Sequence, residues 1–199
     1  MKVNLQRAQE EVLLYHLEES TEKGQLVRRV FAKMRVPVRT ITDEMLGETL
    51  GYAAGLVGFG PSGEAYTGPG VESEVLIMNS FTEKRMNEMF RLFREHQVPP
   101  IPLKAVITEN NKKWRLIDLF SELDQERVMI AGYRKLQDMI GQAAKRKAKD
   151  ADPETWSRLE AAVERAGQLL TGKAEPSLAY LEETIAQLTD ALAAVPAAE

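Results

Sequence analysis

The sequence predicts an α/β protein with a four-stranded, mainly parallel sheet, helices on both faces of that sheet, and an all-helical C-terminal appendage. Three observations predict this class. Short apolar runs alternate with amphipathic segments over residues 1–124, and two halves of that region, residues 11–57 and 73–123, resemble each other. Residues 125–199 instead show only the apolar spacing that is typical of helices.

The segment 73–123 begins with a strand and a helix. Its apolar run Val75–Met78 lacks polar alternation, which predicts a strand covered on both faces. Ser80 and Thr82 are competing N-caps for the helix that follows. Prolines within residues 99–102 end this helix, because a proline nitrogen has no hydrogen to donate.

A second strand and a second helix complete the segment. The strand is Leu103–Thr108, and Asn110 or Asn111 is expected to cap the helix behind it. Trp114 and Phe120 are expected on the buried face of that helix.

The first half, residues 11–57, follows the same plan. Residues 11–17 predict a strand, Ser20 or Thr21 opens a helix, and Val38–Thr42 predicts a second strand. Asp43 is expected to cap a third element, a weak helix up to residue 57. Its glycines recur every four residues and each costs about 1 kcal/mol against alanine. They stand at positions 47, 51 and 55.

These parallels indicate duplication of one supersecondary unit. The run Val12–Leu17 resembles Val75–Ser80, and the tripeptide Thr21–Lys23 recurs as Thr82–Lys84. The Val-Pro pair that ends the first helix recurs 62 residues later. The alternative is chance, because any two βαβ units share apolar spacing. The glycine- and proline-rich residues 58–70 between the halves predict a surface connector.

Alternating strands and helices favour parallel pairing in the strand order 2-1-3-4. A crevice would then open where the carboxyl ends of the first and third strands meet. Those ends are residues 16–20 and 79–82. An antiparallel βαββαβ arrangement is the alternative, although it has no need for the helix expected at residues 43–57.

The C-terminal region predicts a long helix followed by a helical hairpin. The long helix covers residues 125–149, and Asp152-Pro153 is a strong start signal for the next one. Gly172 suits the end of that helix, and Pro176 opens the last. Narrow apolar stripes of this kind bury little surface alone. This region should therefore pack on the α/β unit, on the long helix or on a second subunit.

Composition excludes several classes of protein. The formal net charge is −4, from 26 basic and 30 acidic residues, which argues against a dedicated nucleic-acid surface. Cysteine is absent, and His16 and His96 have no second histidine at ligand spacing, so neither a metal nor a cofactor is predicted. No apolar run is long enough to cross a bilayer, and the amino terminus lacks a signal-peptide core. A cytoplasmic protein is the plain expectation.

The segment from Val75 to Leu123 resembles an uncharacterised bacterial family, domain of unknown function family 3783. The residues that carry the resemblance are the strand Leu103–Thr108 with its lysine, Asn110 or Asn111, and Trp114. The similarity covers about residues 73–123. This family has no established activity, so the resemblance implies a domain and not a function.

Lys104 is the most suggestive single side chain, because it interrupts an otherwise apolar strand. A buried lysine with a lowered pKa acts as a nucleophile or an anion ligand. The structural alternative, which we favour, is an edge-strand lysine that discourages aggregation.

A second group of candidates lies where a strand ends and the next helix begins. Side chains and free backbone N–H groups at such ends hold carboxylates or phosphates, although helix capping uses the same atoms. Trp114 either walls a pocket or fills the core. With Lys104, the candidate ligand-binding residues are Asn79, Ser80, Thr108, Asn110, Asn111 and Trp114.

No recognisable catalytic set accompanies this scaffold. The first functional hypothesis is therefore a non-catalytic binding or regulatory module that self-associates through its C-terminal helices. The second is an enzyme or a binder of a small anion, with its site at Lys104, Thr108 and Asn110. Contact of nucleic acid with the basic run at residues 145–149 is a weaker third hypothesis, because no aromatic residues are interleaved there.

Overall fold

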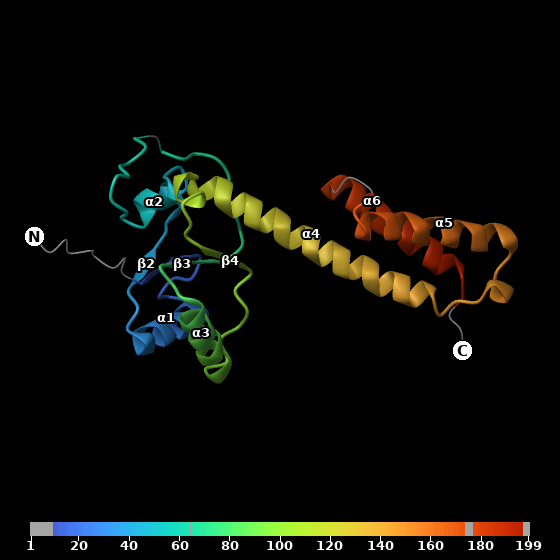
Figure 1. The fold of residues 1–199 in the computed structure, drawn as a ribbon, viewed down its shortest axis with the longest axis horizontal. Coiled ribbons are helices and arrows are strands. Elements are labelled where there is room, and N and C mark those ends of the chain that lie inside the picture. The colour runs from blue at the N-terminus through green and yellow to red at the C-terminus, as the bar shows by residue number, and fades with distance from the viewer. Residues whose placement is uncertain (1–9, 64, 174–176, 197–199) are drawn as a thin grey trace, which may run out of the picture. The chain divides into compact units, whose positions relative to one another are not determined.

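The computed structural model describes residues 10–63, 65–173 and 177–196. The chain forms two compact units, Met1–Asp124 and Gln125–Glu199 (Figure 1). The boundary falls inside one continuous helix, α4 (Leu116–Ala143). The sequence had predicted separate helices on either side of residue 124. No proline lies between residues 116 and 143, so nothing in the backbone chemistry stops the helix there.

Four strands form the sheet of the first unit. They are β1 (Glu11–Tyr15), β2 (Val38–Thr40), β3 (Val75–Asn79) and β4 (Leu103–Val106), in the order β2-β1-β3-β4. β1 pairs with β2 in parallel, and β3 pairs with β4 in parallel. The predicted strand order and the mainly parallel α/β class are therefore confirmed.

The central pair differs from the expectation. β1 and β3 run antiparallel, with Glu11 opposite Asn79 and Tyr15 opposite Val75. Their carboxyl ends consequently lie at opposite edges of the sheet, and the crevice predicted between residues 16–20 and 79–82 does not form. The connection between β2 and β3 explains why β3 runs antiparallel to β1, because it returns the chain to the edge of the sheet where β1 ends. At that edge the Glu72 carbonyl lies 3.3 Å from His16 Nδ1.

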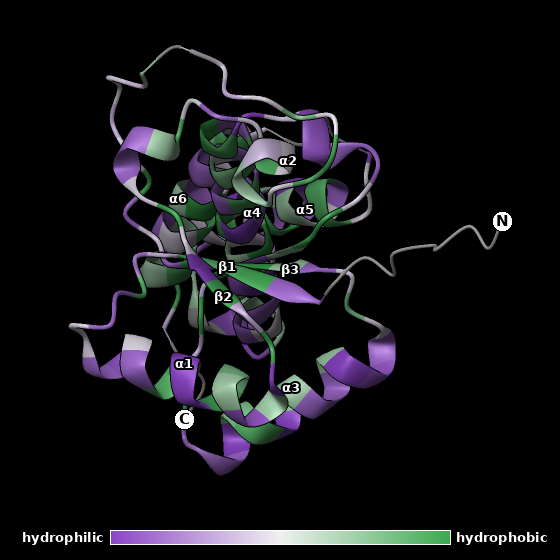
Figure 2. Cartoon of the chain, turned by 90° about the vertical axis from the view of Figure 1, so that its left-hand side faces the viewer, coloured by the Kyte–Doolittle hydropathy of each residue, from purple (hydrophilic) through white to green (hydrophobic). Residues whose placement is uncertain are grey.

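One face of the sheet is covered by α1 (Glu22–Met34) and α3 (Glu83–Glu95), shown beneath the strands in Figure 2. Thr21 caps α1 and Thr82 caps α3, each accepting a backbone hydrogen bond through its side chain. The apolar side chains of this layer form one core cluster with alternate strand residues. Its most buried members include Val12, Leu14, Val27, Phe31, Leu76 and Met89.

The strand alignment of the two halves is one residue off from the predicted one. Val12 and Leu76 face the same core cluster, whereas Val75 faces the other. β1 and β3 therefore correspond at a displacement of 64 residues, as their starts at Glu11 and Val75 also indicate. A slip of one residue moves every side chain to the opposite face of a sheet.

The other face is covered by short elements and by the start of α4. These are the 3₁₀ turns η1 (Asp43–Met45) and η2 (Asn111–Lys113) and the four-residue helix α2 (Leu50–Ala53). The weak helix expected at residues 43–57 is thus reduced to a turn and a single short helix. Their core cluster includes Leu13, Tyr15, Leu46, Leu50, Ile77, Leu116 and Phe120.

The segment that leads into α2 and the segment between η2 and α4 are joined by a reciprocal pair of hydrogen bonds. Leu50 N donates to the Trp114 carbonyl and Leu116 N donates to the Glu48 carbonyl, each over 2.9 Å. Thr49 and Arg115 form an antiparallel bridge between them. Trp114 therefore precedes α4 and is 36% exposed, so its predicted place on the buried face of that helix is wrong. Phe120, by contrast, is fully buried.

The second unit consists of the remainder of α4 with α5 (Pro153–Leu170) and α6 (Leu178–Ala194). A 3₁₀ turn, η3 (Ala148–Asp150), lies between α4 and α5. Asp152 caps α5 as predicted, through bonds of 3.0 Å from Glu154 N and Thr155 N. Gly172, with φ of +70°, follows its last residues. α6 is capped by Ser177, and the predicted start at Pro176 lies outside the described residues.

The three helices share a core that is separate from the sheet. It includes Leu136, Leu159, Ala166, Leu181, Leu188 and Leu192. α4 and α6 approach closely at Gly132, because a Cβ atom there would lie 2.4 Å from Leu181 Cδ2. Within the described residues, no helix combines the length and the apolar character needed to cross a membrane.

Candidate functional site

The parallel pair β3–β4 brings several of the predicted residues to one edge of the sheet. Met78 pairs with Val106, so both strands end at the same level. Asn79 is the last residue of β3 and Ser80 follows it, and the turn that begins at Thr108 follows β4. The Ser80 hydroxyl donates to Asn79 Oδ1 over 3.2 Å.

The turn after β4 uses its own polar atoms. Asn111 Oδ1 accepts from Thr108 N over 2.7 Å, and Asn111 Nδ2 donates to the Val106 carbonyl over 2.9 Å. Asn111 N in turn donates to Thr108 Oγ1 over 3.2 Å. Asn110 is exposed and makes no capping bond with its side chain. These side chains stabilise the turn at η2, while α4 begins five residues later, at Leu116.

Lys104 lies near the start of β4, which is an edge strand. The residue is exposed, and its ammonium donates to the Ile101 carbonyl. Desolvation of the ammonium, with a smaller contribution from the positive charge of Lys23, lowers the pKa of Lys104 below its ordinary value. Lys23 itself bonds Glu74 and the Pro100 carbonyl. Lys104 therefore lies apart from Thr108 and Asn111, towards the other end of β4.

Asn79 lines a cavity of about 300 Å³ with Arg39 and Glu11. Arg39 Nη2 and Glu11 Oε1 form an ion pair at 3.1 Å, and 45% of the Arg39 side chain is exposed. Gly55, two residues after α2, also lines the cavity; its φ is +65° and a Cβ atom there would lie 3.4 Å from Arg39 Nη2. This cavity can accommodate a small polar ligand that bonds a guanidinium and a carboxamide together.

Sequence reasoning did not select Arg39 or Glu11. Both stand at strand positions, and a charged strand residue is ordinarily a solvent-facing one. The signal that was present is the alternation along β2, which places Arg39 on the same face as its partner Leu13.

A second polar cluster lies at the opposite edge, where β1 ends. The buried Tyr15 hydroxyl donates to Asp43 Oδ1 over 2.8 Å, and the His16 ring stacks on Tyr15 at 3.9 Å between centroids. Desolvation, followed by the hydrogen bond to Asp43, raises the pKa of Tyr15 well above its ordinary value. His16 Nε2 is 3.8 Å from the same Asp43 oxygen. Sequence reasoning weighed His16 only as a metal ligand and missed this cluster.

The clusters have no arrangement typical of a metal centre. Among the residues that the structure describes, no group of three or more histidine, aspartate or glutamate side chains lies close enough together to hold a metal ion. Tyr15 and Asp43 instead secure the start of η1 to the sheet.

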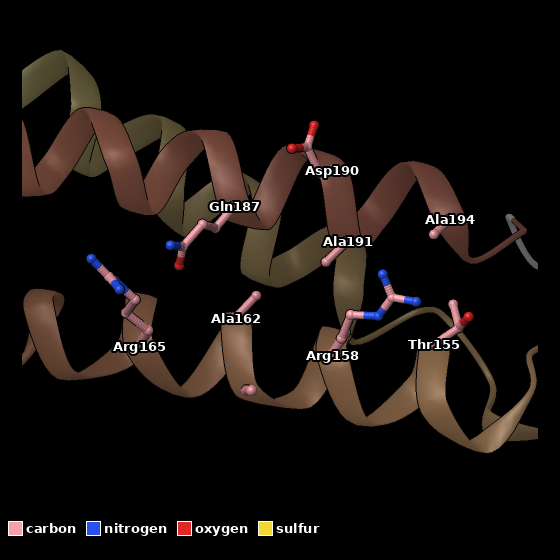
Figure 3. Close-up of a pocket in the computed structure, with 9 residues that line it drawn as sticks. Thr155, Arg158, Ala162, Arg165, Gln187, Asp190, Ala191 and Ala194 are labelled. Atoms are coloured by element: carbon pink, nitrogen blue, oxygen red, sulfur yellow. The ribbon is translucent and has the colours of Figure 1, made fainter.

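The helical unit has a groove of about 480 Å³ between α5 and α6 (Figure 3). Short side chains lie between the two helices, and Arg158 and Arg165 extend from the α5 side. Another cavity, of about 440 Å³, lies between α4 and α5 beside Trp156. The sequence predicted the apolar stripes of these helices but not which of their faces leave a groove.

The chain is thus an α/β protein with a mixed four-stranded sheet, joined through one long helix to a small helical unit. Residues 74–130 match a family model described as Domain of unknown function (DUF3783), so the predicted resemblance is confirmed for that segment. The match contains β3, α3, β4 and the first part of α4, and therefore all seven predicted site residues. It excludes Arg39, Glu11 and the α5–α6 groove. Neither a curated protein nor a solved structure matches the chain significantly.

Proposed function

We propose that this chain is a non-catalytic binding or regulatory module that self-associates through its C-terminal helices. The observation that carries the proposal is the open groove between α5 and α6, which is lined by side chains of both helices. Grooves between helices are common docking sites for a further helix.

The chemistry of the first unit supports a binding role over catalysis. Thr108 and Asn111 form hydrogen bonds within their own turn, and Lys104 donates to a backbone carbonyl. A general acid or base must itself lie within hydrogen-bond reach of the reacting group. These side chains instead form their hydrogen bonds with the local backbone.

The mass of the native chain in solution tests the proposal. One chain has a mass of 22.3 kDa, so self-association predicts a particle of twice that mass or more by light scattering after size exclusion. The apparent mass should rise with concentration if exchange is fast. A strict monomer up to the highest soluble concentration would contradict the proposal. The expected cytoplasmic location belongs to the same proposal, and cell fractionation tests it.

A second candidate function is the binding of a small anion in the first unit. Two places are candidates: β4 and the turn behind it, with Lys104 near the start of the strand and Thr108 and Asn110 after its end, and the cavity that Asn79 lines with the half-exposed Arg39. Arginine forms bidentate bonds with carboxylates and phosphates, and Glu11 is the anion that a ligand would displace.

Thermal shifts against a panel of small carboxylates and phosphates distinguish the two anion sites. A ligand that stabilises wild type and Lys104→Ala equally, but not Arg39→Gln, points to the cavity. The reverse pattern points to the end of β4 near Lys104. If no member of the panel raises the melting temperature, this second function loses its support.

We also propose that the first unit arose by duplication of a βαβ module. Its halves place left-handed residues at matching points, His16 with Ser80 at strand ends and Arg35 with Gln97 at helix ends. The reciprocal bonds between Glu48–Leu50 and the segment at 114–116 relate the halves at one displacement of 66 residues. Comparison of the two halves within a family alignment tests this origin, which predicts greater similarity between halves than chance allows.

A further inference from the structure

We propose that the α5–α6 groove is the surface on which two copies of this chain meet, with α6 of each copy lying in the groove of the other. This inference rests on the proposed function, because it names the surface through which self-association occurs. We assign a second copy as the partner, because the two walls of the groove carry opposite charges and the α6 wall of one copy therefore complements the α5 wall of the other.

Alanines from both helices line the groove. Ala161 and Ala162 come from α5, and Ala191 and Ala194 come from α6. Ala162, Ala191 and Ala194 lie between the two helices in Figure 3. Ala162 belongs to the buried core, whereas Ala194 is exposed. Such short side chains let the backbone of a further helix approach closely, which widens the contact that can be buried.

The walls of the groove carry opposite charges. The α5 wall has Arg158 and Arg165, and the α6 wall has Gln187 and Asp190. Arg165 is committed within its own chain, because it pairs with Glu183 at 2.8 Å and lies over the Tyr180 ring. Among the residues that the structure describes, Arg158 pairs only with the exposed Glu154, at 3.5 Å.

Asp190 is exposed, and its carboxylate has no hydrogen bond or ion pair with another described residue. Each copy therefore presents one loosely held cation and one unpaired anion on opposite walls. A two-fold axis makes every contact occur twice, so Arg158 would pair with Asp190 of the partner subunit and the reverse. Electrostatic complementarity of this kind fixes the register of two helices.

The neighbouring α4–α5 cavity lacks such self-complementarity. Its acidic side chains are already used within α5, where Glu160 accepts from Trp156 Nε1 over 2.8 Å and Glu164 accepts from Gln168 over 3.3 Å. The α5–α6 groove is therefore the better match for a second copy.

A charge-swap series tests the assignment by sedimentation equilibrium of the full chain. Asp190→Arg and Arg158→Asp each place like charges opposite one another across the two-fold axis. Each should weaken the dimer at least about tenfold in Kd. The double variant restores opposite charges and should return Kd to within a few-fold of wild type.

Glu182→Arg is the matched control, because Glu182 is exposed on α6 but does not line the groove. It should leave Kd unchanged. Circular dichroism checks that each variant is folded. If a charge variant fails to fold, Ala194→Arg serves instead, since an exposed position tolerates the substitution while the long side chain fills the groove.

The outcomes separate this inference from the proposed function. A wild-type chain that stays monomeric contradicts both. A wild-type dimer whose Kd is unaffected by Asp190→Arg, Arg158→Asp and Ala194→Arg overturns the groove assignment and leaves self-association standing. Weakening by both single variants without rescue in the double variant overturns the proposed pairing.

Discussion

Gly24 shows at the scale of one residue why the first helix starts where it does. It lies in the first turn of α1, and its amide donates to the capping Thr21 hydroxyl over 3.0 Å. The chain doubles back so tightly that a Cβ atom on Gly24 would lie 1.9 Å from the Glu18 carbonyl oxygen. Because the obstacle is backbone, relief requires movement of the loop that ends β1.

Gly24→Ala should therefore destabilise the first unit by at least about 2 kcal/mol, as overpacking of a rigid site does. The control is Gly167→Ala in α5, where no atom lies within 4 Å of the added Cβ. That change should instead stabilise its helix by about 0.5–1 kcal/mol. Urea unfolding of both variants measures the difference. Equal effects of the two substitutions would contradict the role given to the tight turn.

At the scale of one residue, burial decided which predictions from the sequence held. The uninterrupted apolar run Val75–Met78 predicted a strand covered on both faces, and Val75, Leu76 and Ile77 have no exposed surface. The Trp114 prediction was wrong because spacing alone does not reveal where a helix begins. Its carbonyl accepts a bond from Leu50, a residue 64 positions earlier, and no local pattern encodes that pairing.

At the scale of an element, α4 carries a matched pair of glycines. At Gly132 an added Cβ would lie 2.4 Å from Leu181 Cδ2, in a core where Leu181 is 1% exposed. At Gly141, in the same helix, an added Cβ meets nothing within 4 Å. Alanine improves the intrinsic helix propensity equally at both positions, so the difference between the two substitutions isolates the close approach of α4 and α6.

Gly132→Ala is thus expected to be less stable than Gly141→Ala by about 1–3 kcal/mol, the usual cost of an added methyl group in a packed core. Thermal or urea unfolding followed by circular dichroism measures both. Should the two variants have the same stability, the tight contact between α4 and α6 does not exist in solution.

The start of α5 gives a prediction about pH. The Thr155 side chain donates to Asp152, and with the backbone amides it lowers the pKa of Asp152 below its ordinary value of 3.8. A depressed folded-state pKa gives stabilisation that is complete above the ordinary value and is lost as the pH falls through the folded value. Wild type should therefore be more stable than Asp152→Asn near neutral pH, and the gap should close in acid.

Asparagine is the right comparison because it caps helices about as well as aspartate but does not titrate. Melting temperatures of both proteins over a pH series provide the measurement. A gap that is constant down to acid pH would show that the charge of Asp152 contributes nothing to the cap.

The order of elements was predictable, but the direction of the central strand pair was not. Buried parallel and buried antiparallel strands share the same apolar composition, so Val12–Leu14 and Val75–Ile77 carry no mark of their relative direction. A repeat between the two halves is found outside these strands. Ile41-Thr42 recurs as Ile107-Thr108, 66 residues later, and the same displacement relates the hydrogen-bonded segments at 48–50 and 114–116.

At the scale of the whole molecule, the two units have separate cores. Neither of the two clusters around the sheet shares a residue with the cluster of the helical unit, and only the continuous α4 links them covalently. One tryptophan lies in each unit, Trp114 before α4 and Trp156 in α5. Each unit therefore has its own fluorescent probe.

We expect the two units to unfold with different midpoints, because each has its own core and no residue belongs to the cores of both. Two single-tryptophan variants, Trp156→Phe and Trp114→Phe, report on the first and second unit respectively. Adding Gly24→Ala should lower the urea midpoint reported by Trp114 much more than the one reported by Trp156, and Gly132→Ala should do the reverse. Measurement at one protein concentration keeps the contribution of self-association fixed. If each glycine variant shifts both midpoints equally, α4 transmits enough stability to make the chain a single cooperative unit, and the separation of the cores has no thermodynamic consequence.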